Sequence, residues 1–363
     1  SITLINDKYI PLSLTEMITG LGLLLITVLI ISGSRLIRLE SGDAIITDRE
    51  VEIYLSETTD LDELTKVFAD SGIVRDTTEL KWAARLLGWN RFSIGHYSIE
   101  GSYSYDSLLS KMARGIQDPV EVILIPGSTE QRLTQRIIDT FQFDSTALYN
   151  TINDSTFLAE LEIERKDLIG RLFPDTYALY WTSNPETVLK RILSEFQKSV
   201  IEPNGKKFEQ VNRTVDEIVT LASIIEWEAT KDEEKRKISG LYWNRLNRGM
   251  RLQADPTVNF VVKERRRLLY EDYEIDHPYN TYMNRGLPPG PITNPSLRSI
   301  EAALNPASHD YLYMVASPEG THVFSETFEE HKRESAKWRK WIREQYREKR
   351  RREAEEKNSQ NSL

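Results

Sequence analysis

An uninterrupted apolar segment near the start of the chain is followed by a long run of amphipathic segments. Residues Met17–Ser34 form 18 positions without a charged side chain, most of them Leu or Ile. A helix of that length spans about 27 Å, close to the roughly 30 Å hydrocarbon core of a membrane. Only Lys8 precedes the segment, and Gly33-Ser34-Arg35 is a poor cleavage site. The pattern therefore favours a retained membrane anchor over a signal sequence or a buried core helix.

Between residues 44 and 126, short apolar strands alternate with amphipathic helices. The expected strands are Ala44–Ile46, Val51–Leu55, Gly95–Ile99 and Val120–Ile125. The expected helices are Thr58–Gly72, Leu80–Leu87 and Ser104–Arg114. This small α+β unit resembles a LysM-like fold. A hydrophobic core accounts for its apolar positions, so the pattern gives this unit no chemistry.

From residue 127 onward the pattern is mainly helical. The expected helices are Thr129–Phe141, Ser155–Glu164, Pro185–Ser199, Thr214–Ala229 and Asp232–Arg248. A Pro- and Gly-rich loop at Arg285–Pro291 follows, and Tyr311–Ala316 and Thr321–Phe324 are expected to form a short β hairpin. We therefore expect an α+β protein with four parts. They are an N-terminal stub and transmembrane anchor in 1–38, a LysM-like module in 39–126, a mainly helical domain in 127–332 and a charged tail in 333–363, helical first and then disordered.

The composition removes several classes of function. The 363 residues include 47 basic and 56 acidic side chains, a net charge of −9, and no cysteine. Disulfide scaffolds, thiolate nucleophiles, Cys-ligated zinc and iron–sulfur clusters are therefore excluded. The acidic balance argues against a nucleic-acid partner. The five histidines have no metal-ligand spacing, and no phosphate-binding loop or nucleophile elbow occurs, so we expect no metal and no cofactor.

Two glutamates near the end of one predicted helix are candidates for acid–base chemistry. Thr214 and Glu217 form a capping-box pattern that fixes the start of this helix. Apolar residues then recur at helical spacing as far as Ile225, and the next position on that face is Glu228. A carboxyl group at the end of an apolar face is partly desolvated. Desolvation raises its pKa toward the range that suits a general acid.

Glu226 is the alternative. It lies two residues before Glu228 and is therefore rotated by roughly 200° on the helix, so the two side chains cannot readily share one site. Glu226 extends a second, weaker apolar row on the other side of the helix. Either glutamate could also face solvent, as exposed Glu commonly does on helices. The pattern alone leaves all three interpretations open.

Polar and aromatic residues downstream of these glutamates are typical of a carbohydrate cleft. Amide and hydroxyl groups bind sugar hydroxyls, and aromatic rings contact the C–H faces of sugars. Each residue taken alone could equally be a turn or capping residue, Asp255 before Pro256 above all. The candidate substrate-binding residues are Asn244, Gln253, Asp255, Thr257, Tyr279, Asn280 and Tyr282.

Several sequence blocks, taken in order, resemble a known family. The blocks are Leu172–Tyr177, Ala222–Glu228, Asn244–Leu246, Gly249–Val258, Tyr279–Tyr282, Gly286–Ile292 and Asn305–Pro306. Their order is similar to that of the MltG (YceG-like) family of endolytic murein transglycosylases. The resemblance covers about Val51 to Lys332 and the N-terminal anchor. Several blocks in one order are far more specific than any single block.

The resemblance implies a substrate, a product and a location. Members of the family cleave the β-1,4 bond between N-acetylmuramic acid and N-acetylglucosamine in nascent peptidoglycan. They leave a 1,6-anhydro end and terminate strand elongation beside cell-wall synthesis proteins. They are similar to one another in having one membrane helix, a LysM-like module and a catalytic domain outside the cytoplasm. The basic residues Lys8, Arg35 and Arg38 weakly favour the opposite orientation, and the extracellular location of peptidoglycan overrules that count.

The family's catalytic glutamate falls on Glu228 or Glu226. We choose Glu228, because the apolar face directs it inward and because lytic transglycosylases place their Glu just before a small hydroxyl-bearing residue. The family usually has Glu-Thr at this point, whereas here Ala229 separates Glu228 from Thr230, which keeps Glu226 as the alternative. The family also has Glu-Gly where this chain has Ile169-Gly170, so a contact of that Glu would be missing.

Two other functions compete with a lytic transglycosylase. A lytic transglycosylase needs one carboxyl group, because the muramyl 6-hydroxyl attacks within the same molecule and proximity replaces the second catalytic group. A muramidase on the same scaffold would use Asp255 as a second carboxylate to activate water. A non-enzymatic scaffold would bind glycan through the LysM-like module, and both glutamates would be inert.

Overall fold

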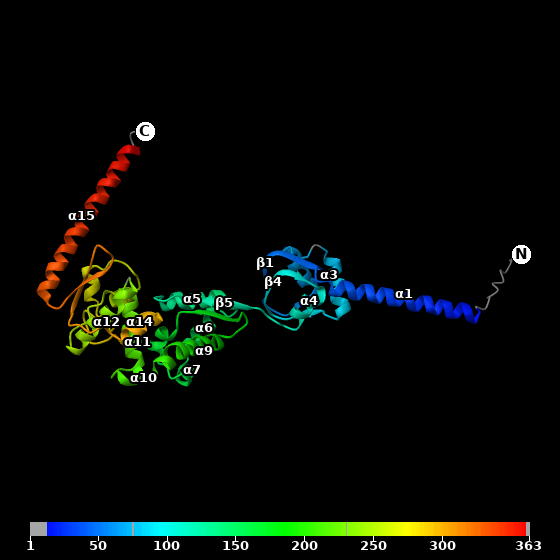
Figure 1. Cartoon of the computed structure of the whole chain (residues 1–363), viewed down its shortest axis with the longest axis horizontal. Helices are drawn as coiled ribbons and strands as arrows, with labels where there is room; N and C mark the ends of the chain where they lie inside the picture. The colour runs from blue at the N-terminus through cyan, green and yellow to red at the C-terminus, as the bar shows by residue number, and fades with distance from the viewer. Residues whose placement is uncertain (1–12, 75, 230, 361–363) are drawn as a thin grey trace. The chain divides into compact units, whose positions relative to one another are not determined.

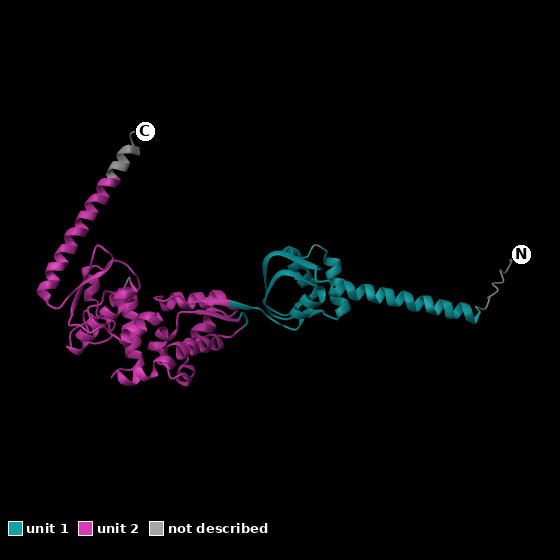
Figure 2. Cartoon of the chain, in the orientation of Figure 1, with its two compact units in different colours: residues 1–120, 180–182 teal, residues 121–179, 183–363 magenta. Residues whose placement is uncertain are grey.

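The computed structural model describes residues 13–360 apart from 75 and 230, and side chains as far as residue 353. The first part of the expected N-terminal stub, Thr230 and the last three residues of the tail therefore lie outside the described residues. The chain divides into two compact units (Figure 2). Unit 1 comprises residues 1–120 and 180–182, and unit 2 comprises residues 121–179 and 183–363.

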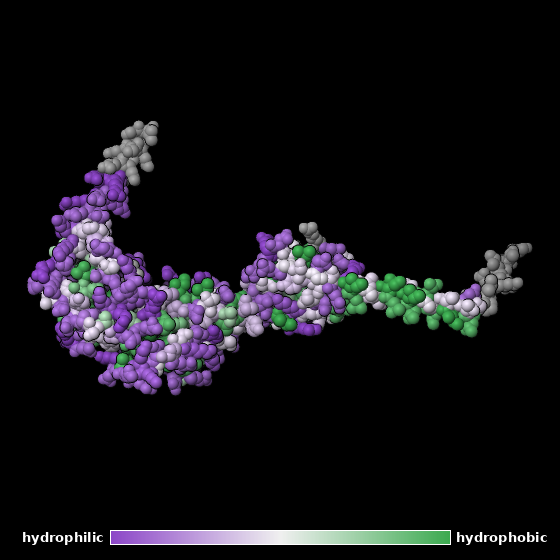
Figure 3. Space-filling model, viewed as in Figure 1, coloured by the Kyte–Doolittle hydropathy of each residue, from purple (hydrophilic) through white to green (hydrophobic). Residues whose placement is uncertain are grey.

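The N-terminal apolar segment forms α1, Leu14–Glu40 (Figure 1). Ser13 caps this helix in a complete capping box with Glu16. The apolar side chains of α1 are mostly exposed, and its surface is largely hydrophobic (Figure 3). Within the described residues, α1 is the one helix long and apolar enough to cross a membrane. The prediction of a mixed α and β protein with one apolar N-terminal helix is confirmed.

The rest of unit 1 is a pair of antiparallel strands with helices packed around one core. Strand β1, Ile45–Leu55, pairs with β4, Gly95–Tyr103, and a bulge between Thr47 and Val51 interrupts the register. The sequence predicted two short strands where this single bulged strand runs. The remaining elements are β2 Thr59–Asp60, α2 Leu61–Asp70, α3 Thr77–Leu87, β3 Arg91–Phe92 and α4 Tyr105–Ala113, and β2 pairs with β3.

Unit 2 begins with short helices around another two-stranded sheet. Its strands are β5, Pro119–Ile123, and β6, Thr176–Tyr180, which pair with each other. The helices are α5 Glu130–Thr140, α6 Ser145–Ile152, α7 Ser155–Glu160, the 3₁₀ turn η1 Arg165–Asp167, α8 Leu168–Arg171, α9 Pro185–Phe196, the π-helical turn η2 Gln197–Ile201 and α10 Glu202–Gln210. Helix α7 ends at Glu160, four residues before the end predicted for it at Glu164.

The centre of unit 2 is α11, Val215–Glu228. Every residue from Ile218 to Ile225 is buried, against α12, Asp232–Asn247, and α14, Leu297–Leu304. Helix α8 also packs on α11, and Gly170 makes this approach possible. A Cβ atom at Gly170 would lie 2.6 Å from Val219 Cγ1 and 2.5 Å from Pro291 Cγ. The glycine therefore fixes how the Pro-rich loop and α8 sit on the central helix.

The remaining elements of unit 2 surround one end of α11. They are α13 Asp255–Val262, the 3₁₀ turn η3 Tyr270–Glu274, the antiparallel hairpin of β7 Tyr313–Ala316 and β8 His322–Ser325, and α15 Phe328–Gln360. The hairpin confirms the one predicted from the sequence. Helix α15 continues to Gln360, so the disorder predicted for the tail is wrong up to that residue.

Candidate functional site

Local sequence fixes the helix that carries both candidate glutamates. The Thr214 side chain accepts a hydrogen bond from the Glu217 amide at 3.1 Å, and the Glu217 carboxylate accepts one from the Thr214 amide at 2.8 Å. The helix predicted over Thr214–Ala229 is therefore confirmed, with its end at Glu228. Within it, Ser223 is fully buried and accepts a hydrogen bond from the Ile292 amide at 3.0 Å, which ties the Pro-rich loop to α11.

Glu228 lines a cavity of about 590 Å³ at the C-terminal end of α11. The residue is partly exposed, toward this cavity. Over the part of the chain that the structure describes, its carboxyl group has no hydrogen-bond or ion-pair partner. Burial, together with the negative charge of Asp255, raises the pKa of Glu228 to about 8. At neutral pH this carboxyl group is therefore protonated in most molecules, which is the state that a general acid needs.

Glu226 has the opposite environment. Its carboxylate accepts hydrogen bonds from the Ser296 amide at 3.0 Å and from the hydroxyls of Ser296 and Ser299, each at 2.6 Å, and Lys235 lies 3.5 Å away. Burial alone would raise the pKa of Glu226, but these hydrogen bonds and Lys235 outweigh burial and hold the pKa below its usual value. Ser296 is also the N-cap of α14. Glu226 therefore joins α11 to α14 as an ionised side chain whose Oε2 atom accepts all of these contacts.

Asp255 lies in the same cavity as Glu228 and is held by two tyrosines. The hydroxyl of Tyr282 donates a hydrogen bond to the Asp255 carboxylate at 2.6 Å, and that of Tyr273 lies 3.5 Å from it. The two tyrosine rings pack with their centroids 4.5 Å apart. Burial and then Asp255 raise the pKa of Tyr282 above its usual value, so its hydroxyl remains a donor. Asp255 is thus a fixed negative charge beside the protonated Glu228.

Gln253 lies on the cavity wall in a strained backbone conformation. Its φ angle is +50°, in the left-handed region that non-glycine residues seldom adopt. Its side-chain oxygen accepts a hydrogen bond from Arg245 at 3.3 Å. The buried Arg245 guanidinium also donates to the carbonyls of Leu312 at 2.6 Å and Leu252 at 2.8 Å. Arg245 therefore joins three segments of the cavity wall, and it has no carboxylate partner among the described side chains.

Five of the candidate residues do not line this cavity. Besides Glu226, these are Asn244, Thr257, Tyr279 and Asn280. The Asn244 amide donates to the carbonyls of His309 at 2.7 Å and Tyr311 at 3.1 Å and so holds that loop.

The other three pack behind the cavity wall. Thr257 is fully buried and shares a 2.8 Å hydrogen bond with Thr281. Asn280 is fully buried and accepts a hydrogen bond from the Tyr282 amide at 3.0 Å, which positions that ring. Tyr279 packs on Phe260 with ring centroids 4.6 Å apart. The expectation that Tyr279 shares a groove with Glu228 is wrong, because its ring fills this apolar contact instead.

Other parts of the cavity wall were missed by the sequence prediction. Tyr242 and Arg245 come from α12, Tyr313 from β7, and His331 and Trp338 from α15. Tyr242 and Arg245 are three residues apart and therefore lie on the same face of α12. This spacing could have indicated that Arg245, rather than the predicted Asn244, faces the cavity. No local signal connects α15 to Glu228, because only the tertiary fold brings the C-terminal helix to this place.

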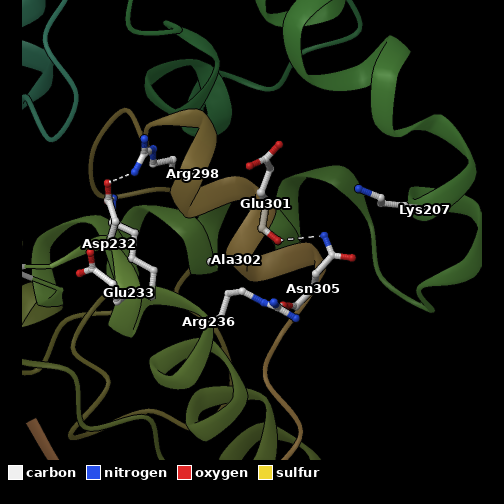
Figure 4. A pocket seen from close by; sticks show the side chains of 9 residues that line it. Lys207, Asp232, Glu233, Arg236, Arg298, Glu301, Ala302 and Asn305 are labelled. Atoms are coloured by element: carbon white, nitrogen blue, oxygen red, sulfur yellow. Dashed lines mark hydrogen bonds and ion pairs between the residues drawn. The ribbon is translucent and has the colours of Figure 1, made fainter.

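A second cavity, of about 690 Å³, lies between α12 and α14 (Figure 4). Three of its charged groups, Asp232, Lys235 and Arg298, are paired with one another. Arg298 and Lys235 lie 2.6 Å and 2.8 Å from Asp232, and Arg236 donates to the carbonyl of Asn305 at 2.9 Å. The hydrogen bond with Lys235 holds the pKa of Asp232 below its usual value, in contrast to the raised pKa of Glu228. We therefore place the candidate active site in the cavity of Glu228.

Comparisons with known proteins point to one family. A model of the YceG-like family matches residues 53–337. The chain is 30% identical over 307 residues to an endolytic murein transglycosylase of Bacillus subtilis, which covers 79% of this chain and 84% of that protein. It is 29% identical over 320 residues to an endolytic murein transglycosylase of Streptococcus pneumoniae, which covers 79% of this chain and 58% of that longer protein.

A solved structure agrees with these relatives. A crystal structure of a YceG-like protein from Listeria monocytogenes superposes with a TM-score of 0.57 and 26% sequence identity. The match covers 79% of this chain and 99% of the other. The matched family region contains both candidate glutamates and the whole cavity wall except Trp338, which follows it directly.

Proposed function

Because this chain belongs to the YceG-like family, we propose that it is an endolytic murein transglycosylase whose single general acid and base is Glu228. The observation that carries the assignment to Glu228 is the raised pKa, about 8, of an unpartnered carboxyl group in a cavity. The names of the relatives in Bacillus and Streptococcus support peptidoglycan as the substrate. Glycan strands are therefore the expected partner.

The first step uses the proton of Glu228. The carboxyl group donates this proton to the oxygen of the β-1,4 bond between N-acetylmuramic acid and N-acetylglucosamine. The bond from that oxygen to the muramyl anomeric carbon breaks, and N-acetylglucosamine leaves with a free 4-hydroxyl. Positive charge develops on the muramyl ring, and the negative charge of Asp255 in the same cavity stabilises it.

The second step returns Glu228 to its starting state. The Glu228 carboxylate takes the proton of the muramyl 6-hydroxyl, and that oxygen bonds to the anomeric carbon. The product is a 1,6-anhydro-muramyl end, and no water is consumed. Because the attacking hydroxyl belongs to the same sugar, no second catalytic carboxylate has to position a nucleophile.

A muramidase that uses Asp255 to activate water is the second candidate function. It is favoured by one observation, the position of Asp255 in the cavity of Glu228. The hydrogen bond from Tyr282 at 2.6 Å already occupies the Asp255 carboxylate, which weakens it as a base toward water. The transglycosylase reaction is therefore the better fit.

We also infer a location for the reaction. Helix α1 is proposed to anchor the chain in the cytoplasmic membrane as a single span, with the residues after α1 on the extracytoplasmic side, where peptidoglycan and its synthesis proteins lie. Unit 1 has two helices, α2 and α3, between the paired antiparallel strands β1 and β4, with the short strands β2 and β3 on either side of the two helices in the sequence. This arrangement supports the proposed LysM-like module. That module would hold the glycan while the cavity of Glu228 cleaves it.

The experiment compares the wild-type chain with Glu228→Gln and Glu226→Gln on purified, peptide-free glycan strands. Wild type is expected to shorten the strands and to give ends that are lighter by one water than hydrolysis products in a mass spectrum. Glu228→Gln should abolish cleavage while folding is retained. Products of hydrolytic mass would favour the muramidase. Unchanged cleavage by folded Glu228→Gln would show that Glu228 is not the acid.

A further inference from the structure

The first turns of α15 are fixed to the hairpin that borders the active-site cavity. The ring of Tyr313, on β7, lies 5.8 Å from the ring of Phe328 and 5.3 Å from that of His331, both on α15. Ser335, one turn further along, is buried. These contacts hold the start of the helix on the hairpin, whereas the described side chains beyond Ile342 are exposed.

One face of this helix forms part of the wall of the cavity that contains Glu228. The cavity is lined by Phe328, His331, Ser335 and Trp338 of α15. Their spacing of three, four and three residues places them along one side of an α helix. The last of them lies ten residues from the first, so this wall is about 15 Å long at 1.5 Å per residue.

Trp338 is an aromatic surface within this wall. It is partly buried and lines the cavity, and its ring stacks on that of Trp341 with centroids 5.0 Å apart and an angle of 18° between planes. The stack limits the orientations of the Trp338 ring. Aromatic rings held in this way bind the C–H face of a sugar without losing much conformational entropy.

A polar group on the same face of α15 lacks a partner. The Nδ1 atom of His331 is buried and makes no hydrogen bond with any group in the described residues. Its Nε2 atom lies 3.4 Å from the Ser335 hydroxyl. Burial, with the nearby charges of Arg245 and Arg339, lowers the pKa of His331, which favours the neutral ring, and a rotation of this ring toward the cavity that it lines would let a nitrogen exchange a hydrogen bond with a sugar hydroxyl or amide. A buried polar atom without a partner is destabilising unless a ligand satisfies it.

We propose that this face of α15 is a saccharide-binding subsite, in which Trp338 stacks on a sugar ring of the glycan strand and His331 binds one of its polar groups. The inference rests on the proposed function for the identity of the sugar polymer. Trp338 and His331 are positioning residues here, because they hold the strand in register and do not transfer a proton in either step. The C-terminal helix thereby becomes part of the enzyme's substrate site.

The test separates binding from cleavage. In the full chain in detergent, Glu228→Gln and the double variant Glu228→Gln/Trp338→Ala are titrated calorimetrically with a peptide-free tetrasaccharide of alternating N-acetylglucosamine and N-acetylmuramic acid. The tryptophan substitution should weaken binding about tenfold, which corresponds to about 1.4 kcal/mol. Trp338→Phe, which keeps an aromatic ring, should recover part of the loss. Tyr346→Ala is the matched control, since Tyr346 is an exposed aromatic of the same helix that does not line the cavity.

Kinetics give an independent readout. With Glu228 intact, Trp338→Ala should raise KM for glycan strands about tenfold and leave kcat within about twofold. This is expected when the lost interaction stabilises the bound substrate and the transition state equally. Equal tetrasaccharide affinity in the presence and absence of Trp338, with circular dichroism showing intact folding, would overturn the inference. A wild-type chain that binds the tetrasaccharide through Trp338 but cleaves no glycan would overturn the proposed function and leave the subsite standing.

Discussion

Replacing Glu228 with Gln should abolish cleavage and at the same time stabilise the folded protein at neutral and alkaline pH. Glutamine has the shape of the protonated carboxyl group but cannot ionise. The folded state of wild type holds the proton with a pKa of about 8, against 4.5 for an unperturbed glutamate. The folded chain therefore binds this proton more tightly than the unfolded chain does. Its stability falls as the pH rises from 4.5 and stops falling above 8.

The size of the effect follows from the two pKa values. Each pKa unit corresponds to about 1.36 kcal/mol, and integration between pH 5 and pH 9 gives a loss of about 4 kcal/mol of unfolding free energy in wild type that Glu228→Gln should not show. Because Glu228 is partly exposed, solvent screening makes this figure an upper bound. The loss is large beside the total stability of a typical domain, roughly 5–15 kcal/mol. The Glu228 carboxyl group is thus costly to ionise in the folded state. Active-site residues often lower stability in this way, because they are selected for activity.

The assay is urea unfolding of the full chain in detergent at a series of pH values, with the variant compared with wild type at each pH. Other titrating groups are common to both and cancel in the difference. Unit 1 does not contain Glu228, so its transition is an internal reference.

Glu226→Gln is the matched control two residues away. Because the pKa of Glu226 is lowered, its ionised form stabilises the fold above the unfolded pKa, and this contribution disappears as the pH falls. Its substitution should therefore destabilise the protein at neutral pH, and less so in acid. Parallel pH profiles for wild type and Glu228→Gln would refute a raised pKa at Glu228.

Three further predictions concern other parts of the molecule. Asp255→Asn should move the alkaline limb of kcat/KM, expected near pH 8 in wild type, to lower pH, because the negative charge of Asp255 helps to raise the pKa of Glu228; an unmoved limb in a pH–rate profile would contradict this. Gly170→Ala should cost about 1–3 kcal/mol in a denaturant titration, because the new methyl group overlaps Val219 and Pro291; wild-type stability would show that α8 can move away. Deletion of residues 1–40 should shift the chain from the membrane fraction to the soluble fraction, and retention in membranes would count against α1 as the anchor.

The sequence predicted local features of unit 2 well and tertiary ones poorly. The helix of Glu228 could be placed because a capping box and an apolar face, Ile218 to Ile225, both act within a few residues. The hairpin at Tyr313 was likewise visible from its turn. Short elements such as α13 and α14 were missed, since they have too few turns to show a period.

The substrate-binding candidates show the same limit. Gln253, Asp255 and Tyr282 were proposed from residue type, and the structure brings them to the cavity of Glu228. Tyr279 and Asn280 belong to the same sequence block but support the wall from behind. Residue type gives the chemistry that a side chain can perform. Which way it points depends on partners distant in sequence, such as Phe260 for Tyr279.

The two glutamates show why one turn of helix can give a carboxyl group either role. Glu226 and Glu228 lie two residues apart on the same helix, so their side chains face different sides of α11. On one side α14 supplies hydroxyl and amide donors, and the carboxylate is ionised and structural. On the other side the helix ends at a cavity where no described group donates a hydrogen bond to the carboxyl group and where Asp255 is a neighbouring negative charge, so the carboxyl group keeps its proton. The pKa of each glutamate is thus set by the groups that pack against its face of the helix. The two roles would be exchanged by exchanging those neighbouring groups, and not by moving a glutamate along the chain.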